Sequence, residues 1–206
     1  MNHCIQHPVI NDRLASIRHK DCPPSEFRRY VQEIAQLMVP AVTADLGTQS
    51  IEVTTPLQVT QCQQLARPII LVPILRAGLG MLEGFLRLLP EASVAHIGMA
   101  RNEQTLEAQS YYFNAPPHLA EAEVIVLDPM LATSGSAAAA MRELQKHGAQ
   151  HLRLACIVVA PEGLAALNET MPALPIYYPA LDEKLNEHGY ILPGLGDAGD
   201  RIFGTV

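Results

Sequence analysis

The chain has 206 residues, of which 49% are hydrophobic, and its formal net charge is −7. This length and composition predict a single domain, residues 1–206, with a sizeable core. An acidic chain without a basic run is a poor candidate for binding nucleic acid. No apolar stretch approaches the roughly 18–20 residues of a membrane span, so we expect no membrane partner either.

The first residues are polar where a secretory signal would need an apolar core, so we expect a cytoplasmic protein. The four cysteines form no C-x-x-C pair, and we expect them to be reduced thiols. They are Cys4, Cys22, Cys62 and Cys156.

Taken in chain order, the hydrophobic pattern predicts helices alternating with short buried strands. The predicted elements are a helix over 25–38, a strand over 51–55, a strand over 69–75, a helix over 79–89, a strand over 94–99, a hairpin arm over 103–118, a strand over 123–127, a helix over 136–147, a strand over 152–159 and a helix over 161–170. This alternation predicts an α/β fold with a mainly parallel sheet flanked by helices. Ligands of such folds bind beyond the carboxyl ends of the strands, which places the loops at 73–78, 100–101 and 128–136 on one rim.

Residues 124–136 form the most informative segment, because an apolar strand there ends in Asp128 and small or hydroxyl residues lead into an Ala-rich helix. A loop of this kind directs backbone N–H groups and hydroxyls at one point beside a helix N-terminus, which favours phosphate binding. An ordinary crossover with small packing residues remains open for this segment alone. The Walker A pattern does not occur in the chain, and the dinucleotide fingerprint is not at this loop.

Two arginines follow predicted strands on the same rim. Arg76 is followed by Ala-Gly after the strand 69–75, and Arg101 follows the strand 94–99. Together they could clamp a diphosphate through bidentate guanidinium contacts, whereas either one alone could equally be a surface residue.

The tail from 186 to 205 holds five of the 13 glycines, together with aromatic and aliphatic residues that a disordered tail would seldom contain. We interpret it as an ordered loop that folds back over the site and contacts a flat heterocycle through backbone groups. Asp197 and Asp200 are acids within this loop. His188 is also there, and we expect a structural histidine rather than an acid–base catalyst.

Three segments carry a resemblance to a known family. They are Val-Pro-Ile-Leu-Arg-Ala-Gly at 72–78, Asp-Pro-Met-Leu-Ala-Thr at 128–133 and Gly-Tyr-Ile-Leu-Pro-Gly-Leu-Gly-Asp-Ala-Gly-Asp-Arg at 189–201. Together they resemble the uracil phosphoribosyltransferase family, and the segments 102–107 and 160–163 fit as well. The loop at 128–136 alone would indicate only the wider phosphoribosyltransferase class, and the tail narrows it to the uracil branch.

The resemblance implies a type I phosphoribosyltransferase core with a C-terminal hood, formed mainly by about 180–206 with N-terminal segments, and a projecting, dimer-contacting β-arm at about 103–118. It implies that uracil and 5-phospho-α-D-ribose 1-diphosphate give UMP and diphosphate. The implied catalytic residues are Arg76, Arg101, Asp128 and Asp197. The implied contacts to phosphoribosyl diphosphate are Arg76, Arg101, Asp128, Pro129, Met130, Leu131, Ala132, Thr133, Ser134, Gly135, Ser136 and Asp197, and those to uracil are Ile191, Gly196, Asp197 and Ala198.

The resemblance further implies Mg²⁺ as cofactor, carried by the substrate without a direct protein ligand, with Asp197 facing it through water. A GTP effector and a homodimer or larger homo-oligomer are expected on the same ground. The alternatives are a non-catalytic nucleotide-sensing regulator of the same fold and a phosphoribosyltransferase for another base.

Two positions in the phosphate loop need comment. Pro129 stands where many phosphoribosyltransferases have a second acid, which fits the uracil branch. Ser134 stands where this family usually has glycine. A positive φ there would cost on the order of 1 kcal/mol for serine. We predict instead a negative φ at Ser134, a hydroxyl that adds a donor, and retained activity.

Overall fold

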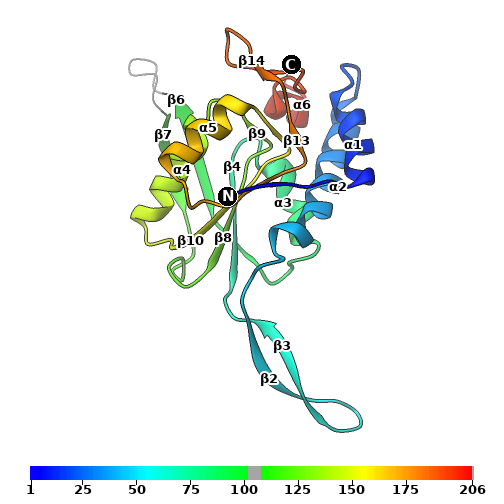
Figure 1. Cartoon of the computed structure of the whole chain (residues 1–206), viewed down its shortest axis with the longest axis vertical. Coiled ribbons are helices and arrows are strands. Elements are labelled where there is room, and N and C mark those ends of the chain that lie inside the picture. Colours follow the sequence, from blue (N-terminus) through cyan, green and yellow to red (C-terminus); the bar gives the residue numbers. More distant parts are fainter. Residues whose placement is uncertain (102–107, 206) are drawn as a thin grey trace.

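A mainly parallel eight-stranded sheet runs through the middle of the part of the chain that the computed structural model describes, residues 1–101 and 108–205 (Figure 1). The side chains of Arg101 and Ala108 lie outside that description. The strand order is β1-β12-β10-β8-β4-β6-β7, with β5 beside β4. The strands are β1 (Asn2–Cys4), β4 (Ile69–Leu75), β5 (Ser93–Val94), β6 (His96–Arg101), β7 (Ala108–Asn114), β8 (Glu123–Leu127), β10 (His151–Ala155) and β12 (Ile176–Tyr178).

Helices cover both faces of this sheet, which confirms the predicted α/β class (Figure 1). Strand β4 is buried almost throughout, and its residues alternate between two core clusters, with Leu71 in one and Ile70 in the other. A strand covered on both faces is therefore a continuous apolar run. The helices are α1 (Pro8–Arg18), α2 (Pro24–Val42), α3 (Leu79–Leu86), α4 (Gly135–Lys146), α5 (Pro161–Thr170) and α6 (Ala198–Phe203).

The predicted strand over 152–159 is wrong as a single element. It breaks into β10 and β11 (Val158–Val159), which belong to different sheets. At the break, the N–H groups of Ile157 and Val158 donate to the carbonyl oxygen of Pro129 at 3.1 and 3.0 Å. Strand β11 then pairs with β9 (Met130–Leu131) and β13 (Ala180–Leu181) in a small parallel sheet. Every residue from 152 to 159 is apolar apart from Arg153, so the pattern carried no sign of the change of partner.

The described residues contain a projecting hairpin that the sequence analysis did not predict. In the described residues, the hairpin that extends away from the body is β2 (Thr48–Thr54) with β3 (Val59–Leu65), at the bottom of Figure 1. Of the expected arm at 103–118, residues 103–107 lie outside the described residues. The strand β7 within it pairs antiparallel with β6 at the edge of the main sheet. The aromatic residues that suggested an arm are therefore part of a sheet edge.

The C-terminal segment and the first helix hold each other through arginines. The Arg18 guanidinium donates to both carboxylate oxygens of Asp182 at 2.8 and 2.5 Å, and also to the carbonyl oxygen of Gly194 at 2.8 Å. Arg201 donates to the carbonyl oxygens of Ile17 and His19, at 2.6 and 2.7 Å. These bonds fix β14 (Lys184–Leu185), β15 (Ile191–Leu192) and α6 above the sheet, and we call residues 180–205 with α1 the hood.

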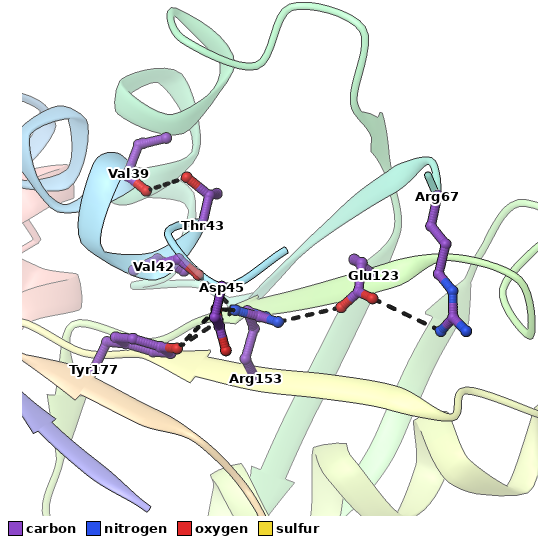
Figure 2. A network of polar contacts seen from close by, with 8 residues as sticks. All are labelled: Val39, Val42, Thr43, Asp45, Arg67, Glu123, Arg153 and Tyr177. Carbon is purple, nitrogen blue, oxygen red and sulfur yellow. Dashed lines mark hydrogen bonds and ion pairs between the residues drawn. The ribbon is translucent and has the colours of Figure 1, made fainter. Parts of the chain in front are cut away.

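A second polar network lies on the α2 side of the sheet, toward the amino ends of the strands (Figure 2). Arg153 on β10 donates to the carbonyl oxygen of Val42 at 2.7 Å and to Asp45 at 2.6 Å. Its other terminal nitrogen donates to Glu123 at 3.3 Å, and Glu123 lies 3.7 Å from Arg67. The network therefore connects the C-terminal end of α2 to two strands.

All four cysteines are free thiols in the structure, and Cys156 is buried. Within residues 1–101 and 108–205, no helix is long and apolar enough to cross a membrane.

We predict that Arg153→Ala lowers the free energy of unfolding by roughly 2–4 kcal/mol, because it leaves Glu123 and a helix-end carbonyl without their buried partner. The melting temperature in differential scanning calorimetry should fall by about 5–10 °C. Arg67→Ala removes only the exposed end of the same network and is the matched control, with an expected change below about 0.5 kcal/mol. Equal losses in both variants would contradict this account.

Candidate active site

The candidate site lies where β4 and β8 end side by side. These strands are parallel neighbours, with Pro73 opposite Leu127, so Arg76 and Asp128 follow them at the same level. The chain runs from β4 to β6 on one side, whereas β8 lies on the other side of β4, which makes this a topological switch point. A cavity of about 230 Å³ is found there, lined by residues 74–77, Met99, Asp128 and residues 130–137.

The loop from 128 to 136 is held in place by β11 and α5. Its first part pairs with β11 as strand β9, and the N–H of Ala160 donates to the carbonyl oxygen of Leu131 at 2.9 Å. Gly163 in α5 packs so closely that a Cβ there would lie 1.9 Å from the carbonyl oxygen of Ala132. Thr133, Gly135 and Ser136 are exposed at the cavity, and α4 starts beside them. The positive end of a helix dipole thus faces the loop, as anion binding requires.

Asp128 is a carboxyl group in an unfavourable environment for charge. Its side chain is partly buried and accepts a hydrogen bond from the N–H of Met130 at 3.3 Å. Loss of solvation raises the pKa of Asp128 to about 7, and the Met130 N–H offsets this only in part. A carboxyl group with this pKa at the end of a cavity marks a functional site.

Ser134 has a φ of 68°, so the predicted negative φ is wrong. The residue is in the left-handed region directly before α4, and its side chain makes no capping hydrogen bond there. The carbonyl oxygen of Ser134 accepts the first helical bond, from Ala138 at 2.8 Å. The chain reverses between β9 and α4 within a few residues, and this turn requires the conformation that glycine adopts without cost.

Arg76 lies on the cavity wall and reaches the hood. Its Nη2 donates to Asp200 of α6 at 3.0 Å. The turn that carries it is pressed against β8, because a Cβ on Gly78 would lie 2.3 Å from the carbonyl oxygen of Leu127. The peptide bond between Leu75 and Arg76 is cis. The sequence analysis expected Arg76 at the site but missed its pairing with Asp200.

The residues expected to contact the base lie in the hood. Ile191 is buried in β15, and Ala198 is buried at the start of α6. Gly196 has a φ of 77°, and the Asp197 side chain caps α6 by accepting from the N–H of Asp200 at 2.9 Å. A Cβ on Gly199 would lie 3.7 Å from Arg76 Nη2, so this end of α6 is beside the cavity wall.

Two expected site residues, Arg101 and Pro129, are placed differently or only in part, and His188 lies away from the cavity wall. The backbone of Arg101 ends β6, the neighbour of β4, but its side chain lies outside the described residues. Pro129 does not line the cavity, and its carbonyl oxygen instead holds the start of β11. His188 is exposed beside Glu187, at 3.6 Å, and is not a residue of the cavity wall.

In residues 1–101 and 108–205 there is no group of three or more His, Cys, Asp or Glu side chains that could hold a metal ion. Asp128 lines the cavity with a carboxyl group, which suits a metal ion whose remaining ligands are water and substrate phosphates. Mg²⁺ in enzymes typically binds this way, through one or two carboxylates, water and substrate phosphates.

A loop suited to phosphate at the switch point of a parallel sheet defines the broad class of α/β proteins that bind phosphorylated ligands. A hypoxanthine phosphoribosyltransferase from Staphylococcus aureus shares this fold, with a TM-score of 0.54 and 12% identity, covering 77% of this chain and 76% of that one.

The family model "Uracil phosphoribosyltransferase" matches residues 4–205. A uracil phosphoribosyltransferase of Symbiobacterium thermophilum is 52% identical over 202 residues, which are 98% of this chain and 97% of that protein. The solved AQ2163 protein from Aquifex aeolicus has a TM-score of 0.92 and 38% identity, with 98% of both chains covered. The chain belongs to the uracil phosphoribosyltransferase family.

We predict that Ser134→Gly raises the free energy of unfolding by about 1 kcal/mol, because it relieves a left-handed residue. The melting temperature should rise by about 2–4 °C in calorimetry. Ser136→Gly is the matched control, since this residue lies within α4 and glycine there should lower stability by roughly 0.5–1 kcal/mol. A gain at both positions, or at neither, would argue against this interpretation of the loop.

We predict a pH-dependent gain in stability for Asp128→Asn. Burial raises the pKa of Asp128 to about 7 in the folded chain, whereas the ordinary pKa of an aspartate in an unfolded chain is 3.8. The stability of the parent protein therefore falls as pH rises through this window. The Asn variant should melt a few degrees above the parent at pH 8, with a clearly smaller advantage at pH 5. The control Asp21→Asn, at an exposed carboxylate, should keep the pH dependence of the parent's stability. If Asp128→Asn also kept that pH dependence, the raised pKa of Asp128 would be disproved.

Proposed function

We propose that this chain transfers the phosphoribosyl group of 5-phospho-α-D-ribose 1-diphosphate to N1 of uracil, giving UMP and diphosphate. The observation that carries the proposal is one cavity in which Arg76, Asp128 and the loop 130–136 converge beneath the hood. Membership of the uracil phosphoribosyltransferase family over residues 4–205 supports the choice of substrate.

Each end of the sugar phosphate has a counterpart in the cavity. The exposed hydroxyls and N–H groups of Thr133, Gly135 and Ser136 bind the 5-phosphate beside the N-terminus of α4. Asp128 accepts hydrogen bonds from the ribose hydroxyls, and a bound cation lowers its pKa and keeps it ionised. This explains why a desolvated carboxyl group is retained here.

The displacement is direct, with no covalent enzyme intermediate. The bond from C1 of the ribose to the diphosphate oxygen breaks as uracil N1 attacks the opposite face, the bonding electrons leave with the diphosphate, and the N1 proton passes to water. Arg76 and Arg101 stabilise the charge that grows on the diphosphate, and removing one such contact would cost roughly 10²–10³ in rate. Holding both substrates in line supplies much of the remaining acceleration.

The hood provides the base site. Ile191, Gly196, Asp197 and Ala198 contact uracil, largely through backbone groups, because the side chains of Ile191 and Ala198 are buried in the core. Closing the hood over the ribose keeps water from hydrolysing the activated sugar. Buried backbone donors and acceptors that match uracil would reject cytosine, which differs at one exocyclic group.

Mg²⁺ is part of the proposal and comes with the diphosphate. When bound, it supplies Lewis-acid charge neutralisation on the leaving group. Asp128 is the carboxylate in the cavity that would face it, and Asp197 would face it through water.

We further propose a cytoplasmic homo-oligomer that responds to GTP. Support for the oligomer comes from the β2–β3 hairpin, where Leu57, Val59 and Leu65 are 94%, 54% and 41% exposed. A lone two-stranded hairpin is only marginally stable in water, so the arm needs a surface to cover, and a second copy offers one. Sedimentation equilibrium measures the assembly, and a monomer at micromolar concentration would contradict this part of the proposal.

The direct test mixes the purified protein with phosphoribosyl diphosphate, Mg²⁺ and uracil, with and without GTP, and measures UMP by chromatography. Cytosine, hypoxanthine and orotate serve as parallel substrates. We expect UMP from uracil alone, faster with GTP, and a loss of roughly 10²–10³ in Arg76→Ala. A nucleotide from another base would reassign the substrate. Binding of phosphoribosyl diphosphate without any product would favour the non-catalytic regulator.

A further inference from the structure

The guanidinium of Arg76 is held by a single short helix of the hood. Its Nη2 donates to Asp200 Oδ1 at 3.0 Å, and its Cζ lies 5.9 Å from the ring centroid of Phe203, three residues further along α6. Asp200 is itself held, because Thr205 Oγ1 donates to the same oxygen at 2.6 Å and the N–H of Asp200 donates to Asp197. Arg76 therefore meets a residue whose position is fixed by two further hydrogen bonds.

This pair leaves guanidinium donors for a ligand. The bond to Asp200 uses Nη2, and a guanidinium also carries N–H groups on Nε and Nη1. A planar group fixed on one edge presents its other edge in a defined direction, which suits bidentate binding of a phosphate. The guanidinium of Arg76 can therefore bind Asp200 and the diphosphate at the same time.

Stability does not explain the pair. The side chains of Arg76 and Asp200 are 57% and 35% exposed, and exposed ion pairs contribute little to folding. The Thr205 hydroxyl and the Arg76 guanidinium lower the pKa of Asp200, so the pair stays charged throughout the neutral range. The ion pair contributes little to stability and lies beside the cavity, which indicates a role in the reaction.

We propose that Asp200 is a positioning residue that orients Arg76 toward the diphosphate of phosphoribosyl diphosphate. Because Asp197 and Ala198 lie on the same helix, the pair also links occupation of the diphosphate site to the base site. This inference rests on the proposed function and deepens it, since Asp200 acts only through Arg76.

A double-mutant cycle tests this dependence. Asp200→Ala should lower kcat/KM for phosphoribosyl diphosphate about tenfold, by raising its KM, while the KM of uracil changes less. In an Arg76→Ala background the same change should cost less than about twofold, because the group that Asp200 orients is gone. Asp200→Asn keeps an acceptor oxygen and should fall between the parent and Asp200→Ala.

The matched control weakens the same helix without touching Arg76. Arg28 donates to the carbonyl oxygen of Ile202 at 2.7 Å, so Arg28→Ala loosens α6 from α2. Its effect should be the same in the parent and in Arg76→Ala. Calorimetric titration with phosphoribosyl diphosphate and Mg²⁺ gives a second readout, and Asp200→Ala should weaken that binding while Arg28→Ala leaves it closer to the parent.

The outcomes separate the two proposals. A parent protein that makes no UMP overturns the proposed function. A parent that makes UMP, combined with equal effects of Asp200→Ala in both backgrounds, overturns only the positioning role. An effect of Arg28→Ala that also vanishes with Arg76→Ala would overturn it too, because the loss would then follow any disturbance of α6. Melting curves of each variant identify those that fail to fold.

Discussion

The parallel pairing of β4 with β8 is the constraint on which the site depends. Their register places Pro73 beside Leu127, so the residues that follow the two strands emerge together. Gly78 leaves no room between the two turns, since its missing Cβ would meet a carbonyl oxygen of β8. Arg76 and Asp128 are therefore brought together by backbone hydrogen bonds and close packing, before any attraction between their own charges acts.

Charged side chains lie at both ends of the main sheet. Those at one end stabilise the fold, and those at the other end belong to the candidate site. At the amino ends, Arg153 is buried and bonded to a helix end and two carboxylates, which is an arrangement that secures the fold (Figure 2). At the carboxyl ends, Asp128 loses solvation without a cationic partner. Because its pKa is raised, that carboxyl group lowers the free energy of unfolding at neutral pH. A destabilising group of this kind is typical of a site that binds a ligand.

The sequence was sufficient for features that depend on local pattern. The strand over 69–75, the strand-to-helix loop at 128–136 and the α/β class followed from apolar runs, small residues and their order. Ser134 was predicted wrongly because φ there is set by the turn between β9 and α4, which only tertiary pairing reveals. The Arg76–Asp200 pair joins residues 124 positions apart, and the single run 152–159 hid a change of sheet. The aromatic residues of 103–118 did not reveal that β7 lies at the sheet edge, because such residues suit a sheet edge as well as a projecting hairpin.

The shortness of α6 has a consequence for how this enzyme can change over evolution. Within six residues the helix carries Ala198, a proposed contact to uracil, Asp200 and Phe203 at Arg76, and the anchor Arg201. With the roles proposed above, a substitution that reshaped the slot for a different base would shift Arg76 as well. New base specificity is difficult to acquire one mutation at a time here, and divergence is expected to replace the whole hood while the sheet beneath it stays the same.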